Sequence, residues 1–162
     1  MKKRIFFFCV ILVFILGLQT GCSKNGQNGK MDWEEKIRAD FFYDQTDIEE
    51  VMADVVSIKV KQDETKLTVT VKAPDICDEL LDWMDSVSDE AFTESAMEAE
   101  ILQLLKKSEK VETEHVLTFS NQDESVKITY TSEFSEVISC GLTRFYAEVT
   151  QRVLEEMGDS AK

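Results

Sequence analysis

Two stretches in which apolar and polar residues alternate constrain the fold of this chain most strongly. The first covers residues 56–71 and is interrupted by Gln-Asp-Glu at 62–64, and the second covers residues 115–130 and is interrupted by Gln-Asp-Glu at 122–124. A period of two places successive side chains on opposite faces of a strand, and a short polar break between two such runs is typical of a hairpin. The sequence therefore predicts two antiparallel hairpins, each with one apolar face.

Apolar residues at helical spacing fill the segments around the two hairpins. Before the first hairpin they predict a helix from Trp33 and a second helix capped by Thr46, which forms a capping box with Glu49. After the second hairpin they predict one long helix from Ser132, which Gly158 should end. Its apolar side would carry Phe134, Ile138, Leu142, Phe145, Val149 and Val153.

Two further helices are expected between the hairpins. Pro74 and Asp75 should open the first of them, with an apolar side made of Ile76, Leu80, Trp83 and Val87. The second should begin at Ser88, with Lys106 and Lys107 in its last turn and an apolar stripe made of Phe92, Ala96, Ala99 and Leu102. The order αα-ββ-αα-ββ-α predicts an α+β fold in which helices pack on one face of an antiparallel sheet.

The two hairpins also share a pattern, QDETKLTVTV and QDESVKITYT, and a helix with a cysteine follows each of them. An internal ββα repeat would produce this likeness. Similar composition in two polar hairpins with acidic turns would produce it as well, and repeat arrays usually need more than two units. The sequence leaves both explanations open.

The amino terminus has the pattern of a secretory signal. Lys2, Lys3 and Arg4 precede an uncharged apolar run over residues 5–18. That run is shorter than the roughly 20 apolar residues that a membrane-spanning helix needs. Its length fits the apolar region of a signal peptide, which has about 7 to 15 residues. The sequence therefore predicts an exported protein.

The run ends in Leu18-Gln19-Thr20-Gly21-Cys22, which resembles the lipobox of bacterial lipoproteins. Gln19 stands where that family usually has an aliphatic residue. The resemblance implies cleavage before Cys22 and a diacylglyceryl group on its thiol, and two acyl chains suffice for stable membrane anchoring. It also implies a place in the bacterial envelope, on the outer side of the cytoplasmic membrane or on the outer membrane of a cell that has one.

These features divide the chain into four parts. We expect a signal peptide over residues 1–21, a lipidated cysteine with a flexible tether over 22–31, one α+β domain over 32–158 and a short tail over 159–162. Residues 23–30 contain no apolar side chain and would reach roughly 15 Å as a coil. A mature chain of this size suits a single core.

The charge excludes one class of partner. The full chain has 18 basic and 32 acidic residues, and removal of the signal peptide with its three basic residues leaves a mature charge of −17. Such a chain repels nucleic acid, and by net charge it repels an anionic lipid surface too, so that the domain would hang by its lipid alone. No basic stripe with interleaved aromatic residues offsets this repulsion.

Few residues point to chemistry. Glycine-rich phosphate loops, HExxH, GxSxG and EF-hand patterns are all missing from the sequence. The single histidine, His115, has the parity of Leu117 and Phe119, which is more typical of a core position than of a catalytic one. Cys77 and Cys140 are candidates for a disulfide that export would permit, and two buried free thiols are equally consistent with the sequence. We therefore expect no catalytic residue, no metal and no cofactor.

One spacing stands out from the acidic background. Asp78, Asp82, Asp85 and Asp89 would lie along one side of a helix that continued from Pro74 through Ser88. This row is a candidate face for a cation or for a basic partner, and a simply solvated face is the alternative. A hard cation such as calcium usually requires carbonyl ligands from a loop as well.

The sequence as a whole favours a lipid-anchored extracytoplasmic binding module without catalysis of its own. Its partner would be an envelope protein or peptide, with basic character to match the acidic domain. A small envelope hydrolase with a dispersed site is the first alternative. An immunity or inhibitor lipoprotein that blocks a partner is the second.

Overall fold

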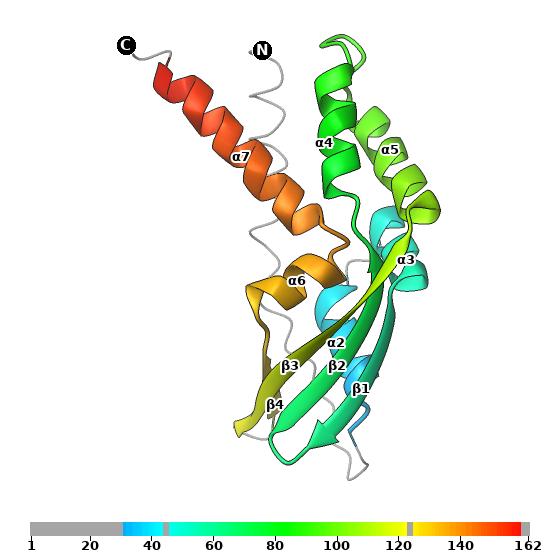
Figure 1. Ribbon diagram of the computed structural model, residues 1–162, viewed down its shortest axis with the longest axis vertical. Coiled ribbons are helices and arrows are strands. Elements are labelled where there is room, and N and C mark those ends of the chain that lie inside the picture. The colour runs from blue at the N-terminus through cyan, green and yellow to red at the C-terminus, as the bar shows by residue number, and fades with distance from the viewer. Residues whose placement is uncertain (1–30, 44–45, 123–124, 160–162) are drawn as a thin grey trace.

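The computed structural model describes residues 31–43, 46–122 and 125–159 and has an α+β fold (Figure 1). The signal peptide, Cys22 and the tether lie outside these residues. Within them, six helices and four strands follow one another as α2 (Trp33–Phe41), α3 (Asp47–Val55), β1 (Ser57–Asp63), β2 (Lys66–Pro74), α4 (Cys77–Ser86), α5 (Glu94–Lys107), β3 (Lys110–Gln122), β4 (Ser125–Thr129), α6 (Ser132–Ile138) and α7 (Leu142–Asp159). The predicted α+β class is confirmed.

The four strands form one antiparallel meander in the order β1-β2-β3-β4. Val69 pairs with Val60 on one side and with His115 on the other, in an uninterrupted register. One face of the sheet is buried, with Ile58, Leu67, Val69, Val71, Leu117 and Ile128 all 5% exposed or less. The alternation that predicted the hairpins therefore corresponds to a sheet with one face in the core.

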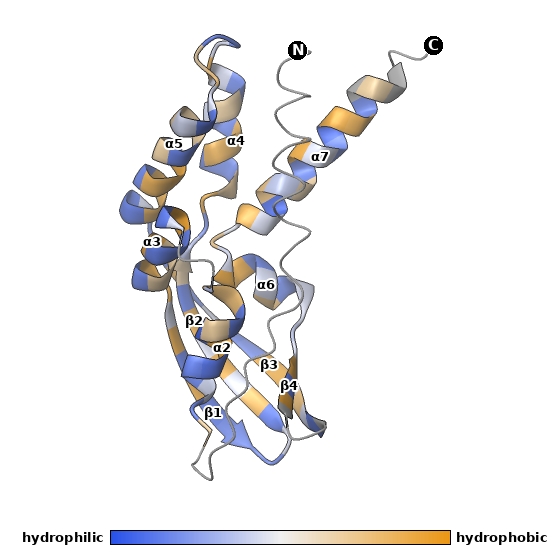
Figure 2. Ribbon diagram, turned by 180° about the vertical axis from the view of Figure 1, so that it is seen from behind, coloured by the Kyte–Doolittle hydropathy of each residue, from blue (hydrophilic) through white to orange (hydrophobic). Residues whose placement is uncertain are grey.

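The helices fall into two groups. Helices α2 and α6 lie across the apolar face of the sheet (Figure 2), whereas α3, α4 and α5 gather at the end of the sheet opposite the hairpin turns (Figure 1). Helix α3 packs against α5, and α4 packs against both α5 and α7. Helices thus cover one face of the sheet, as predicted, and extend the core beyond its end.

Side-chain caps explain where several helices begin. Thr46 caps α3 by accepting a hydrogen bond from the backbone nitrogen of Glu49, which confirms the predicted start of that helix. Thr93 caps α5 and Thr131 caps α6 in the same way. Asp32 caps α2 and accepts from two backbone nitrogens. Each cap supplies an acceptor for a nitrogen that has no partner within its own helix.

The predicted start of the helix between Ser88 and Lys107 is wrong. Ser88 opens a turn instead, because the backbone nitrogens of Ala91 and Phe92 donate to its carbonyl oxygen, and α5 begins only at Glu94. Phe92 therefore does not belong to the helical stripe. The buried side of α5 consists of Met97, Ile101, Leu104 and Leu105 rather than of Ala96, Ala99 and Leu102, while Lys106 and Lys107 occupy the last turn as expected.

The single long helix predicted after Ser132 is two helices. Helix α6 ends at Ile138, and α7 begins at Leu142. Between them Cys140 and Gly141 adopt positive φ angles of 56° and 82°, which redirect the chain. At the other end, the described helix continues through Gly158 to Asp159, so Gly158 does not end it.

The helix predicted from Pro74 begins later than expected. Pro74 is the last residue of β2, and α4 starts at Cys77. Leu80 is buried as predicted, and so are Leu81 and Met84, whereas Trp83 is half-buried at the edge of the core. The two proposed ββα units also differ, because α6 packs on β2 and α7 while α4 packs on α5 and α7.

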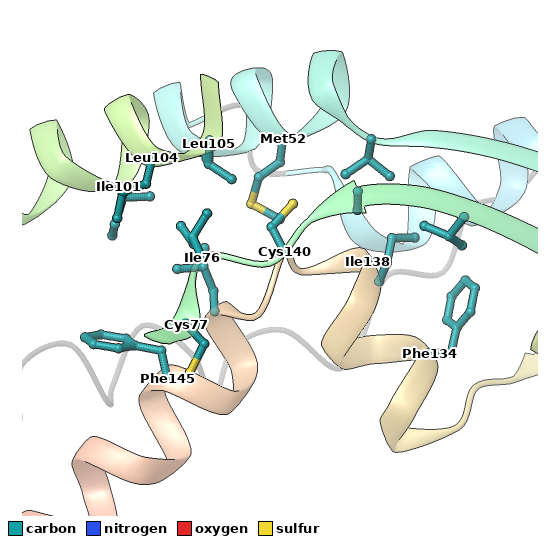
Figure 3. Close-up of a cluster of buried hydrophobic side chains, with 14 of the residues drawn as sticks. Met52, Ile76, Cys77, Ile101, Leu104, Leu105, Phe134, Ile138, Cys140 and Phe145 are labelled. Atoms are coloured by element: carbon teal, nitrogen blue, oxygen red, sulfur yellow. The ribbon is translucent and has the colours of Figure 1, made fainter. Parts of the chain in front are cut away.

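The core joins the sheet layer to the helical end without a break. Ile76, Ile101, Leu105, Ile138 and Phe145 are each fully buried. Figure 3 shows the side chains of α5, α6 and α7 converging on Ile76, which lies in the connection between β2 and α4. These side chains therefore belong to an apolar cluster that includes residues of the sheet and of the helical end.

Candidate functional site

The predicted aspartate row is only partly formed. Asp78, Asp82 and Asp85 lie on α4, but the helix ends at Ser86, so Asp89 lies in the following turn. Ser88 begins that turn, which prevents the helix from extending as far as Asp89. The four carboxylates therefore do not form one continuous helical face.

Arg144 of α7 binds the first of these aspartates and two further acids. Its Nη2 donates to both carboxylate oxygens of Asp75, at 3.3 and 3.1 Å, and to Oδ1 of Asp78 at 3.2 Å. Its Nη1 lies 3.5 Å from Oε1 of Glu136. Arg144 thereby joins α4 and α6 to the first turns of α7, and its buried Nε has no hydrogen-bond partner.

Asp75 also caps the start of α4 at the same junction. Its Oδ1 accepts a hydrogen bond from the backbone nitrogen of Cys77 at 3.1 Å, in the first turn of α4. The N-cap residue Ile76 has no side chain that could do this, so Asp75 takes over the role of the cap. The backbone nitrogen of Ile76 donates to the carbonyl oxygen of Cys140 at 3.0 Å and ties the β2–α4 connection to the α6–α7 connection.

A second ion pair lies further along the same two helices. Nη1 of Arg152 donates to both carboxylate oxygens of Asp85, each at 3.1 Å. Arg144 and Arg152 are eight residues apart and their aspartates seven, so ion pairs bridge α4 and α7 at two points about two turns apart, although the two helices diverge (Figure 1). Because these pairs are largely exposed, each contributes only about 0–1 kcal/mol, and they set the direction of α7 more than they stabilise it.

The surface of this helix pair stays acidic in spite of the two arginines. Asp78 remains 83% exposed and Asp85 60% exposed at the side chain, even though each accepts a hydrogen bond. Asp82 is exposed beside them on α4, and Glu148 and Glu155 add charge on α7. The surface formed by α4 and α7 is therefore acidic, and two of its α4 carboxylates are already bound to arginines. It differs from the predicted row, which lay on one helix and included Asp89.

Helix α7 extends beyond its partner. Helix α4 ends at Ser86, one residue after the Asp85 ion pair, whereas α7 continues for seven residues after Arg152 and projects from the body of the protein (Figure 1). Val149 is buried nearer the start of α7, and Val153 is half-buried. Leu154 and Met157 are 59% and 45% exposed. We call these last apolar residues, Val153, Leu154 and Met157, the α7 tip.

Cys77 and Cys140 are free thiols, and both are buried. Figure 3 shows Cys77 directed toward Phe145 and Cys140 directed toward Met52, with Ile76 between them. Burial raises the pKa of Cys140 to about 12. Burial also raises the pKa of Cys77, although the neighbouring Arg144 guanidinium acts in the opposite direction. The candidate disulfide is not formed, and both thiols stay protonated at neutral pH.

His115 occupies a core position rather than a catalytic one. It is 7% exposed, its Nε2 lies 3.0 Å from Oγ1 of Thr113, and its ring meets Phe134 edge-on at 5.4 Å. Phe134 also stacks on Tyr130 and contacts Phe41 edge-on. His115 is therefore one ring of an aromatic cluster between the sheet and α6.

A polar network next to this cluster was not predicted from the sequence. The hydroxyl of Tyr130 donates to Oδ2 of Asp40 at 2.8 Å, and Lys36 pairs with the same carboxylate. Burial and the hydrogen bond to Asp40 raise the pKa of Tyr130 far above its usual range. The phenol stays neutral and ties β4 to α2, which is a structural role.

Two observations on the described residues concern metal and small-molecule binding. No group of three or more His, Cys, Asp or Glu side chains in the described ranges is placed to hold a metal ion. A shallow hollow at the start of α2 is lined by Asp32, Glu34, Glu35 and Arg38. Arg38 is already used for structure, because it donates to the carbonyl oxygens of Ala53 and Val56 and so satisfies the end of α3.

Comparison with protein-family models, with characterised proteins and with solved structures finds no match to this chain. Among the residues that the structure describes, no helix is both long and apolar enough to cross a membrane. The acidic α4–α7 surface and the exposed α7 tip are therefore the features from which a function can be argued.

Proposed function

We propose that this protein is a lipid-anchored extracytoplasmic module that binds a basic envelope protein or peptide through the α7 tip. The lipobox-like residues at Thr20, Gly21 and Cys22 support the anchor. The observation that carries the binding proposal is the projection of α7 beyond α4, which leaves Leu154 and Met157 exposed. Leu154 and Met157 are three positions apart on the helix, so their side chains are neighbours and form a small apolar patch, and an exposed apolar patch is a candidate contact surface.

The neighbouring charges define the chemistry of the partner. Glu155 lies on the projecting part of α7, and Asp82 and Asp85 lie on the adjacent α4. An apolar stripe flanked by carboxylates suits a partner segment with apolar anchors and basic flanks, such as a basic amphipathic helix. Attraction between the charges would speed the encounter and would weaken as salt screens them.

This proposal is favoured over the dispersed-site hydrolase. Such an enzyme would need His115 to meet carboxylates in an open site, whereas its neighbours are Thr113 and the ring of Phe134. An inhibitor lipoprotein would use the same α7 tip but would stop the activity of its partner. An activity assay of the purified partner with and without this protein separates the inhibitor from a binder that leaves the partner active.

Substitution of both exposed residues of the α7 tip by glutamate should weaken partner binding by at least about tenfold, because two apolar side chains each contribute about 1.5–3 kcal/mol when fully buried. The partner is first identified by mass spectrometry after photo-crosslinking from position 154 and, as a control, from the exposed Ser95 on α5. The purified partner is then titrated against the wild type and against Leu154→Glu/Met157→Glu.

A matched control variant tests the position rather than the charge. Val116 on the sheet is 58% exposed, almost the same as Leu154, so Val116→Glu adds a carboxylate at an equally exposed apolar site. It should leave the affinity unchanged. Equal affinity of the double α7 variant and the wild type would show that the α7 tip is not the contact surface.

A further inference from the structure

The charges of the described residues are strongly segregated. The sheet face opposite the apolar core holds six exposed lysines, namely Lys59, Lys61, Lys66, Lys72, Lys110 and Lys127, together with three acids, Asp63, Glu112 and Glu114. These are half of the 12 basic side chains in the described ranges but only three of the 29 acidic ones. The face therefore carries +3 in a protein that is strongly acidic everywhere else.

None of these six lysines takes part in an ion pair within the described residues. The arginines and Lys36 differ, because they are bound to acids or to carbonyl oxygens. The lysines share the face with Thr68 and Thr70, and no helix crosses it (Figure 1). Helices α2 and α6 lie on the opposite side of the sheet (Figure 2). The face is thus open, positive and, apart from the exposed Val116, polar.

The chain enters the domain at the hairpin-turn end of the sheet, on the side that carries α2 and not on the side of the lysines. Trp33 begins α2 and donates from Nε1 to Oε1 of Gln62 at 2.8 Å, next to the turn between β1 and β2. Lys61 and Lys66 flank the same turn. The sequence predicts a coil with a reach of roughly 15 Å for residues 23–30, and such a tether would hold this end of the sheet close to the bilayer.

We call the sheet face that holds the six exposed lysines the lysine face. We propose that it docks on anionic phospholipid headgroups and orients the anchored domain on the membrane. The inference rests on the proposed lipid anchor and goes beyond it, since the anchor alone leaves the domain free to rotate. Each lysine near an anionic leaflet adds a weak attraction, and the tether gives the face a high effective concentration at the surface. A weak attraction is then sufficient to orient the anchored domain.

Net charge does not prevent this docking. The acidic residues of the helices lie behind the sheet or at the end of the sheet far from the hairpin turns. Charges more than a Debye length of about 8 Å from the headgroups are largely screened. A negative surface therefore acts mainly on the nearest side chains, and the separation of charge turns the lysine face toward it. The repulsion expected from the mature charge of −17 applies only to a protein with evenly spread charge.

Amine footprinting of the full lipidated protein in vesicles tests the docking. The protein is placed in phosphatidylcholine vesicles with or without phosphatidylglycerol, and the rate of lysine acylation is measured by peptide mass spectrometry. Lys106 and Lys107 at the exposed end of α5 are internal controls. On anionic vesicles the lysines of the face should react several-fold more slowly than these controls, since about 1 kcal/mol corresponds to about a fivefold change. High salt, or vesicles of phosphatidylcholine alone, should abolish the difference.

A charge variant completes the test. Lys59→Gln, Lys61→Gln and Lys66→Gln together remove three charges and should also abolish the protection of Lys72 and Lys127. Flotation of the vesicles in a density gradient shows separately whether the protein is anchored. If the protein floats with both kinds of vesicle but the ratio of face to control acylation rates is the same on both, the docking is contradicted and the anchor is not. A protein that floats with neither contradicts the anchor, and the docking falls with it. Protection that requires added envelope protein assigns the face to a protein partner and also overturns the proposal.

Discussion

Replacement of Gly141 by alanine should lower the free energy of unfolding by about 2–4 kcal/mol, because two costs combine. Gly141 has a φ of 82°, which side chains other than glycine adopt only with strain. A Cβ at this position would also lie 2.2 Å from Oδ1 of Asp75. Asp75 would have to move and would lose its bonds to the Cys77 nitrogen and to Arg144.

Urea denaturation of four proteins separates these two costs. The set consists of the wild type, Gly141→Ala, Asp75→Ala and the double variant. If the contact with the carboxylate matters, Gly141→Ala should cost less in the Asp75→Ala background, and the remaining cost is the backbone strain. A Gly141→Ala variant as stable as the wild type would contradict the assigned geometry of the α6–α7 junction.

Replacement of Phe134 by alanine should cost about 3–5 kcal/mol, the range for removing a large aromatic side chain from a core. Phe134 is fully buried, stacks on Tyr130 at 5.4 Å and meets His115 and Phe41 edge-on. Removal of its ring deletes three aromatic contacts at once and leaves a cavity between the sheet and α6. The typical free energy of unfolding of a protein is about 5–15 kcal/mol, so this single substitution would remove a large part of the stability.

The midpoint of urea unfolding measures this effect, and two controls qualify it. Phe134→Leu keeps most of the volume and should cost much less. Leu154→Ala removes apolar atoms from a residue that is 59% exposed and should change stability by less than about 0.5 kcal/mol. Similar unfolding midpoints for Phe134→Ala and Leu154→Ala would show that the aromatic cluster does not hold the sheet to α6.

The parts of the fold that local sequence determines were predictable. The hairpins follow from a period of two, which survives because each strand buries only one face. The start of α3 follows from the hydrogen bond between Thr46 and the Glu49 nitrogen, two residues that are three positions apart. In both cases the decisive interaction lies within a few residues, so a single sequence contains the necessary signal.

The division between α6 and α7 was missed for a physical reason. Ile138, Leu142 and Phe145 keep helical spacing across the break, and all three are buried. The apolar pattern therefore continues while the backbone turns at Cys140 and Gly141. The glycine was the available signal, since it is one of two glycines in the predicted domain and the only one away from its end.

The features of the candidate site depend on contacts between distant residues. Arg144 and Asp75 are 69 positions apart, and Tyr130 and Asp40 are 90 positions apart. The aspartates of α4 could be found by their spacing, but their binding to arginines of α7 could not. The lysine face has the same origin, because six scattered lysines come together only when the register of four strands is known.

We propose that this domain acts at a membrane to which Cys22 anchors it. Intact-mass analysis of the wild-type protein extracted from cell membranes tests it most directly, with Cys22→Ser as the unprocessed control. The claim predicts a chain that begins at Cys22, without residues 1–21, and carries the added mass of a diacylglyceryl group. A wild-type protein that keeps its signal segment, or that begins at another residue and carries no lipid, would contradict it.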